Sequence, residues 1–203
     1  PRSSCPSSSY SPAALLDSGA ATVEIESYPL AAGEGARTTG TPATVVGREA
    51  ERELLADLLE RPGGAPIVLL EGEPGIGKST LWEESVRRAR ELTERVLTCR
   101  PAETEAALPF AALSDLLGPL LDEGLELLPE PQRLALGGAL LLTTPPDGPI
   151  DRLAVFQAVL SLVRGQDTAT TVLAIDDVQW LDAPSAAVLE FVLRRIGDAP
   201  VRA

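Results

Sequence analysis

Apolar residues follow two patterns along this chain. Short apolar runs of strand length occupy 67–70, 95–99 and 171–175, and the last run is apolar on both faces, as is typical of a buried parallel strand. Elsewhere the apolar residues recur at helical spacing, which predicts helices over 50–59, 81–92, 131–142, 150–163 and 184–196. Strands that alternate with helices predict an α/β fold in which helices flank a parallel sheet.

The region between the second and third predicted strands is long and helical in pattern, so we expect a helical insertion there. One of its helices opens near Phe110, and Gly118-Pro119 is expected to break or kink it. Residues 143–149 predict a loop. The helix over 150–163 is expected to turn one stripe toward the core, formed by Leu153, Phe156, Gln157, Leu160 and Val163.

Capping signals mark both ends of the last predicted helix. Asp182 is a plausible N-cap, and Pro184 would then lie in the first turn. Gly197 is a plausible stop. We therefore interpret Asp182 as a helix cap in preference to a ligand.

The first 43 residues differ in composition from the rest. They are rich in Ser, Pro, Gly, Ala and Thr and show no sustained period, so we predict a disordered leader or linker over 1–43. Alternation over Val23–Glu26 is too short to predict an element alone. The folded domain is predicted to occupy 44–203.

A glycine-rich stretch lies between the first strand and the helix that follows it. The residues Gly72-Glu73-Pro74-Gly75-Ile76-Gly77-Lys78-Ser79-Thr80 fit the phosphate-binding pattern G-x-x-x-x-G-K-[ST] in its required strand–turn–helix context. Glycines at 72, 75 and 77 allow a tight turn with inward N–H groups, and the helix adds its positive dipole end. Lys78, the only lysine in the chain, would reach the β- and γ-phosphates of ATP, and Ser79 would ligate Mg²⁺.

The third apolar strand ends in two acids, Asp176 and Asp177. Ligands bind at the carboxyl edge of parallel sheets, so both carboxylates are expected near the phosphate-binding loop. Asp176 would hold Mg²⁺, and Asp177 would orient or deprotonate the attacking water. The alternative is a pair of loop or cap carboxylates, and the pattern does not decide whether Gln179 and Trp180 border the site or only pack.

Composition excludes several functions. The net charge of -13 repels nucleic acid and anionic membranes, and the absence of His removes imidazole acid–base chemistry. No apolar stretch approaches 18 residues and no signal pattern opens the chain, so we expect a cytoplasmic protein without a membrane partner. Cys5 and Cys99 have no metal or redox spacing, and Cys99 is interpreted as a core residue.

Four stretches together resemble a known family: VVGRE at 45–49, GEPGIGKST at 72–80, ALPFAAL at 107–113 and LAIDDVQWLDAPS at 173–185. They are similar to the ATPase module of the large LuxR-type transcriptional regulators, which belong to the STAND class of AAA-like P-loop NTPases. The resemblance covers roughly residues 44 to 203. In these terms the glycine-rich loop is the Walker A motif and the acidic strand is the Walker B motif.

The resemblance implies more than the residues show by themselves. Val46, Gly47 and Arg48 would border the adenine, and Thr80 would approach the α-phosphate. The module would be a slow nucleotide switch whose ATP state controls self-association. DNA would be bound only through a helix-turn-helix region C-terminal to this module.

The same resemblance predicts a sheet of order 5-1-4-3-2, which this chain would contain only in part. The chain has no Met, which suggests a fragment or a processed chain. The fourth strand would begin near Val201 and would separate the loop strand from the Asp176 strand. If those two strands paired directly, Asp176 would shift by about 4.8 Å and could not share Mg²⁺ with Ser79. We therefore expect residues 1–203 alone to fold poorly and to hydrolyse ATP more slowly than an extended chain.

Other functions remain open at this point. A small-molecule P-loop kinase would need an arginine-rich lid, and no such cluster stands in a suitable loop. A nucleotide-dependent scaffold would bind ATP without turning it over. An ABC-type ATPase is disfavoured because no LSGGQ-like stretch precedes the acidic strand.

Overall fold

The computed structural model describes residues 21–25, 48–60, 67–93, 95–144, 148–165, 169–197 and 199–203. The strands are β1 (Ala21–Ile25), β2 (Val68–Gly72), β3 (Val96–Cys99), β4 (Thr171–Ile175) and β5 (Val201–Arg202). The helices are α2 (Glu49–Glu60), α3 (Lys78–Leu92), α4 (Ala111–Leu127), α5 (Glu130–Ala139), α6 (Arg152–Arg164) and α7 (Ala183–Leu193), with short 3-10 turns η1 (Glu103–Glu105) and η2 (Val178–Trp180). The predicted α/β fold is confirmed, and most element ends agree with the sequence pattern within three residues.

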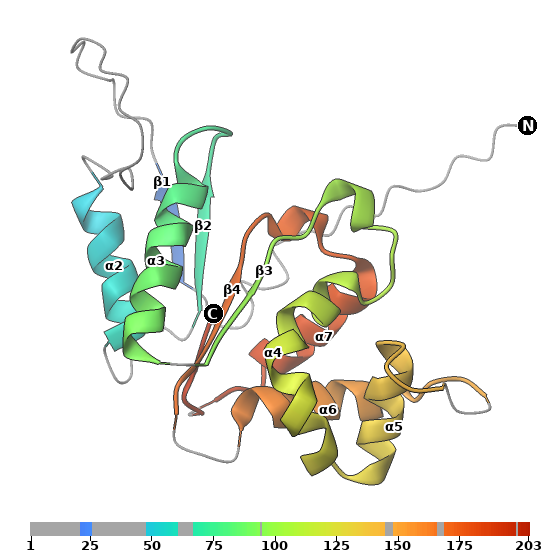
Figure 1. Cartoon of the computed structure of the whole chain (residues 1–203). Helices are drawn as coiled ribbons and strands as arrows, with labels where there is room; N and C mark the ends of the chain where they lie inside the picture. Colours follow the sequence, from blue (N-terminus) through green and yellow to red (C-terminus); the bar gives the residue numbers. More distant parts are fainter. Residues whose placement is uncertain are drawn as a thin grey trace, which may run out of the picture.

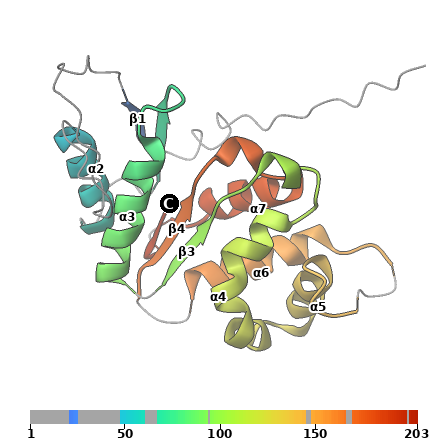
Figure 2. The ribbon, with the colours of Figure 1, turned by 45° about the horizontal axis from the view of Figure 1, so that its top comes forward.

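All strand pairs are parallel. β3, β4 and β5 form one sheet in that order, and β1 pairs with β2. The N–H of Val68, at the start of β2, donates to the carbonyl of Ala203, directly after β5 (2.8 Å). Figures 1 and 2 likewise place the C-terminus between β2 and β4. β5 therefore lies between β2 and β4, near Val201 as expected, and the two strands do not pair with each other.

β1 is an element that the sequence pattern did not predict. Residues 21–25 fall inside the segment assigned to a disordered leader, yet they pair with β2 from Ala21↔Val68 to Ile25↔Gly72. The Val23–Glu26 alternation is too short to predict an element alone, and the strand here is stabilised by backbone hydrogen bonds to its partner β2. The other leader residues, 1–20 and 26–43, lie outside the described part of the chain.

α4 runs without interruption through Pro119, so of the two outcomes predicted at Gly118-Pro119, a break or a kink, the break does not occur. Proline removes one helical N–H, the donor to the Asp115 carbonyl, and Asp115 and Pro119 are both exposed, where water can satisfy that carbonyl. Leu116 and Leu117, in the helical turn before the proline, are fully buried and anchor the helix against the core. Packing therefore outweighs the local cost of the proline.

The core is divided into two clusters. The larger one joins β3, β4 and β5 to the helices α4, α5, α6 and α7, and the smaller one joins Leu55 of α2 to Leu81 of α3. Leu153 is 59% exposed, so its predicted place on the buried stripe of α6 is wrong; Val155, Ala158 and Val159 are buried there instead.

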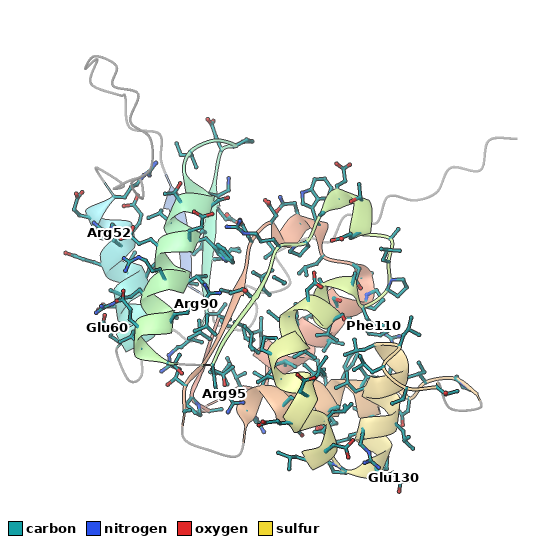
Figure 3. The ribbon with its side chains drawn as sticks, in the orientation of Figure 1. Arg52, Glu60, Arg90, Arg95, Phe110 and Glu130 are labelled. Atoms are coloured by element: carbon teal, nitrogen blue, oxygen red, sulfur yellow. The ribbon has the colours of Figure 1, made fainter. Side chains whose placement is uncertain are left out.

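α2 and α3 lie together beside β2 (Figures 1 and 2), with Leu55 packed on Leu81. Two surface ion pairs add to this contact, Arg52–Glu84 (2.5 Å) and Arg88–Glu60 (2.6 Å). Figure 3 shows Arg52 and Glu60 near opposite ends of α2. Exposed pairs of this kind each contribute less than about 1 kcal/mol, so apolar packing provides most of the attachment.

Candidate functional site

The glycine-rich loop connects β2 to α3 as its pattern predicts. Gly75 and Gly77 have φ angles of 81° and 102°, which side-chain-bearing residues rarely adopt. A Cβ at either position would meet no atom within 4 Å, so backbone conformation and not space requires glycine there. Gly77 is the N-cap of α3 and makes no side-chain cap hydrogen bond. The first N–H groups of α3 are thus left for an anionic ligand.

Lys78 folds back over this loop. Its Nζ donates to the carbonyls of Gly72 (2.9 Å) and Glu73 (3.1 Å), at the start of the loop. These are neutral acceptors, and a phosphate oxygen is a stronger, charged one. The ammonium group is therefore placed where it can exchange backbone carbonyls for phosphate.

Ser79 and Asp176 meet although they are 97 positions apart in the chain. Ser79 Oγ donates to Asp176 Oδ1 at 3.5 Å. Two oxygens that share an octahedral Mg²⁺ at about 2.1 Å lie about 3 Å apart, so a small adjustment brings these two into metal-binding geometry. Asp176 follows β4 and Ser79 lies in the first turn of α3, as expected.

The donor set also fits Mg²⁺ in number. The described residues contain no group of three or more His, Cys, Asp or Glu side chains that could hold a metal ion. Mg²⁺ sites commonly use one or two protein oxygens and complete the shell with water and substrate phosphates. One serine and one carboxylate beside a phosphate-binding loop match this arrangement.

Asp177 lies next to Asp176 but in a different environment. Its backbone is left-handed (φ 52°, ψ 49°), and its exposed side chain accepts a hydrogen bond from Gln179 Nε2 (2.8 Å). The N–H of Asp177 donates to Asp176 Oδ1 (3.1 Å) and so helps to hold that carboxylate. Gln179, which the sequence left undecided, therefore contacts a site residue.

Arg48, which is expected at the adenine edge, contacts the glycine-rich loop. It is 9% exposed, pairs with Glu51 (3.0 Å) and donates from Nη2 to the carbonyl of Ile76 (3.1 Å). The arginine thus supports the glycine-rich loop directly. Val46 and Gly47 lie outside the described residues. Thr80 is half-buried in the first turn of α3.

Arg100 is a neighbour of the site that the sequence analysis missed. It follows β3 directly, and its Nε lies 3.7 Å from Asp176 Oδ2. A usable signal was present, because Arg100 follows its strand as Asp176 follows β4, and adjacent parallel strands end at one edge. The sequence does not show that β3 pairs with β4, and without that pairing the position of Arg100 after its strand does not place it next to Asp176.

The comparison with protein families agrees with this geometry. The model of the AAA ATPase domain matches residues 44–202. The chain belongs to the AAA ATPase family. Membership implies nucleotide binding and hydrolysis, with ATP and Mg²⁺ as the usual substrate and metal. Searches of curated proteins and of solved structures gave no significant match. None of the helices among the described residues has the length and apolar character needed to cross a membrane.

Proposed function

We propose that this AAA ATPase domain is a nucleotide switch that binds Mg·ATP at residues 72–80 and Asp176 and hydrolyses it slowly. The observation that carries the proposal is the 3.5 Å approach of Ser79 to Asp176. These side chains come from separate strand–helix units, and their meeting at the end of a glycine-rich loop is the arrangement that phosphate and metal recognition requires.

Each residue has a role in this proposal. The loop N–H groups and the start of α3 would bind the phosphates, and Lys78 would leave its two carbonyl partners for them. Ser79 and Asp176 would hold Mg²⁺, which would supply positive charge to offset that of the phosphates. Asp177 would orient or deprotonate the attacking water, and Thr80 would approach the α-phosphate. Arg48, through Ile76, would keep the loop in shape.

The finer proposal is that this switch belongs to a large LuxR-type regulator of the STAND class. It rests on the four stretches at 45–49, 72–80, 107–113 and 173–185. In that role the ATP state would control self-association in the cytoplasm, and DNA would be contacted only by a region C-terminal to this domain. The net charge of -13 agrees with a domain that does not itself bind DNA.

The experiment measures ATP retention and phosphate release by the same purified chain, with Mg²⁺ and with EDTA. We expect ATP to bind more tightly with Mg²⁺ than with EDTA. We expect the turnover number for ATP hydrolysis to lie below ~1 s⁻¹, which is the low end of the range for typical enzymes. Ser79→Ala should remove most of the gain from Mg²⁺. Failure of wild-type protein to bind ATP in the presence of Mg²⁺ would contradict the proposal.

A second function, a scaffold that binds ATP without hydrolysing it, is favoured by one contact. Gln179 Nε2 occupies Asp177 Oδ1 at 2.8 Å, which makes that oxygen a poorer acceptor for a water proton. Retention of intact ATP over many hours would support the scaffold. Phosphate release that rises in Gln179→Ala would instead show that Asp177 acts on water and that Gln179 restrains it.

A further inference from the structure

Arg100 stands at the edge of the sheet where the proposed metal ligand emerges. Cys99 and Ile175 are register partners, so the residues that follow them, Arg100 and Asp176, leave adjacent strands side by side. The N–H of Asp176 donates to the carbonyl of Cys99 (3.1 Å), which extends the pairing by one residue. The backbone therefore fixes the two charged residues as neighbours.

The guanidinium of Arg100 bridges β4 to α3. Its Nη2 donates to Glu83 Oε1 at 2.7 Å, and its Cζ lies 4.5 Å from the ring centroid of Trp82. Ser79, Trp82 and Glu83 occupy one face of α3, at spacings of three and four residues. The helix face that presents Ser79 to Asp176 thus also holds Arg100 against Asp176.

We propose that Arg100 is a positioning residue for Asp176 and, through it, for Mg²⁺; this rests on the proposed function. Arg100 attracts Asp176 Oδ2 from one side (3.7 Å), and Ser79 and the Asp177 N–H contact Oδ1 from the other. The carboxylate is held with Oδ1 facing Ser79 before any metal arrives. Glu83 offsets the charge of Arg100, so the arginine orients the carboxylate without strongly repelling a cation.

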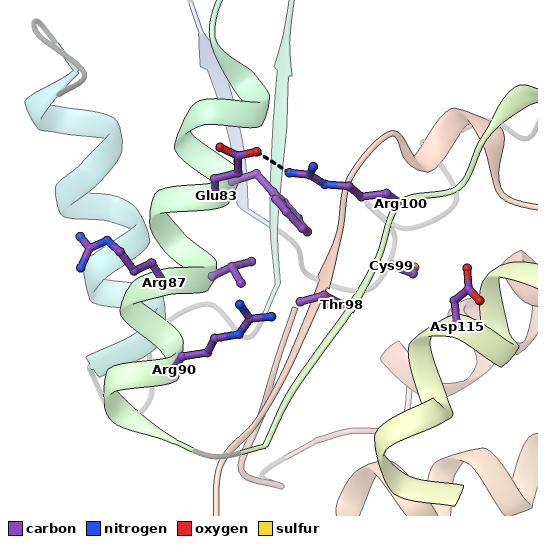
Figure 4. A pocket seen from close by; sticks show the side chains of 9 residues that line it. Glu83, Arg87, Arg90, Thr98, Cys99, Arg100 and Asp115 are labelled. Carbon is purple, nitrogen blue, oxygen red and sulfur yellow. Dashed lines mark hydrogen bonds and ion pairs between the residues drawn. The ribbon is translucent and has the colours of Figure 1, made fainter. Parts of the chain in front are cut away.

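The surroundings show that contacts, and not dense packing, hold Arg100 in place. It borders a cavity of about 740 Å³ that Trp82, Val86, Arg90 and Thr98 also line (Figure 4). Figure 4 shows Glu83 and Arg100 pointing toward each other across this space. The Arg100 side chain is 52% exposed. Replacing it should therefore leave the core intact.

A charge-balanced double variant tests the proposal. Arg100→Gln with Glu83→Gln removes the bridge and keeps the net charge of the region. The control is Arg87→Gln with Glu91→Gln, which removes the Arg87–Glu91 pair within α3 (2.6 Å), and with it the Arg88–Glu91 pair (3.0 Å), away from Asp176. Calorimetry with ATP in Mg²⁺ and in EDTA gives the gain in affinity from the metal. Loss of an outer-shell partner typically weakens metal affinity 10–100-fold, so we expect about a 10-fold smaller gain for an exposed partner.

The two affinities together distinguish a positioning role of Arg100 from a structural one. An unchanged affinity in EDTA with a smaller Mg²⁺ gain, absent from the control, supports the positioning role. A gain in ATP affinity from Mg²⁺ that is unchanged or larger in the double variant would overturn the positioning role. Equal losses of ATP affinity in Mg²⁺ and in EDTA would also overturn it, because they indicate general structural damage. A wild-type protein that binds ATP without any Mg²⁺ gain would overturn the proposed metal site and this inference with it. Mn²⁺ binding to the ATP-bound protein, followed by electron paramagnetic resonance, gives a readout independent of turnover.

Discussion

The carboxylate of Asp182 accepts the backbone N–H of Phe110 at 2.8 Å, across 72 positions of the chain. The same carboxylate accepts the N–H groups of Ala112 (3.2 Å) and Ser185 (2.9 Å). It therefore caps α7, as the sequence predicts, and the start of α4 as well. Asp182 is 2% exposed and has two helix N-termini directed at it, whose positive dipole ends favour a carboxylate at this position.

Asp182→Ala should be one of the most destabilising single changes in the chain. Three backbone N–H groups would lose their acceptor, and unsatisfied buried groups cost about 1–3 kcal/mol each. We expect the free energy of unfolding to fall by about 3 kcal/mol, measured by urea denaturation. Asp151→Ala is the control, because Asp151 caps α6 alone and is exposed; its loss should cost about 1 kcal/mol. Equal losses in the two variants would argue against the double cap.

Lys78→Ala should weaken Mg·ATP binding about 10- to 100-fold, because a charge-assisted contact to phosphate contributes about 1.5–3 kcal/mol. Calorimetry measures the effect. Arg90→Ala is the matched control on the same helix, since the Arg90 side chain makes no hydrogen bond or ion pair within the described part of the chain. A similar loss in both variants would point to general electrostatic attraction, and equal affinity in Lys78→Ala would refute the phosphate-binding loop.

The two adjacent aspartates should have separable effects. Asp176→Asn should lose the Mg²⁺-dependent part of ATP affinity, because Oδ1 faces Ser79. Asp177→Asn should retain ATP but slow its hydrolysis, because only the attacking water is affected. Nucleotide affinity and phosphate release are measured for both. Loss of binding in both variants to the same extent would show that this division of roles is wrong.

Removal of β1 should destabilise the domain. Deleting residues 1–26 leaves one edge of β2 without its strand partner, whereas deleting residues 1–18 keeps the whole of β1. We expect the first truncation alone to increase light scattering and to lower Tm by about 2–4 °C for each kcal/mol lost. Identical melting and solubility in the two truncations would show that β1 contributes nothing to the domain.

Cys99 should be unreactive in the folded protein. Burial, followed by the negative charges of Asp115 and Asp182, raises the pKa of the Cys99 thiol from 9.0 to about 12. At pH 8 the thiol stays protonated, and thiolate is the reactive form. In a Cys5→Ser background, Ellman's reagent should react only after denaturant is added. Rapid labelling of the native protein would contradict the buried position.

The same shift predicts a pH dependence of stability. Below pH 9 the thiol of Cys99 is protonated in both the folded and the unfolded protein, so its contribution to the free energy of unfolding is fully present. Between pH 9 and about 12 the unfolded chain releases a proton that the folded chain keeps, so stability falls by up to about 1.4 kcal/mol per pH unit. Urea denaturation across this range should show a shallower fall in Cys99→Ala than in wild type, with Cys5→Ser as the control.

Local chemistry explains what could be predicted. The glycine-rich loop is contiguous, and its glycines, lysine and serine act through backbone geometry within a few residues. The apolar run before Asp176 marks a buried strand whatever its neighbours are, and parallel strands bring their carboxyl ends to one edge. For these reasons the sequence alone identified both halves of the candidate site.

Contacts between distant segments decided the rest. β1 is stabilised by its pairing with β2, and α4 continues through Pro119 because Leu116 and Leu117 are buried. Asp182 caps α4 in addition to α7 because the start of α4 packs against it. Arg100 became part of the site only because β3 pairs with β4. Periodicity along a chain identifies which face of an element is apolar, but the partners that cover it are specified by tertiary packing, since their interaction energies depend on proximity in space.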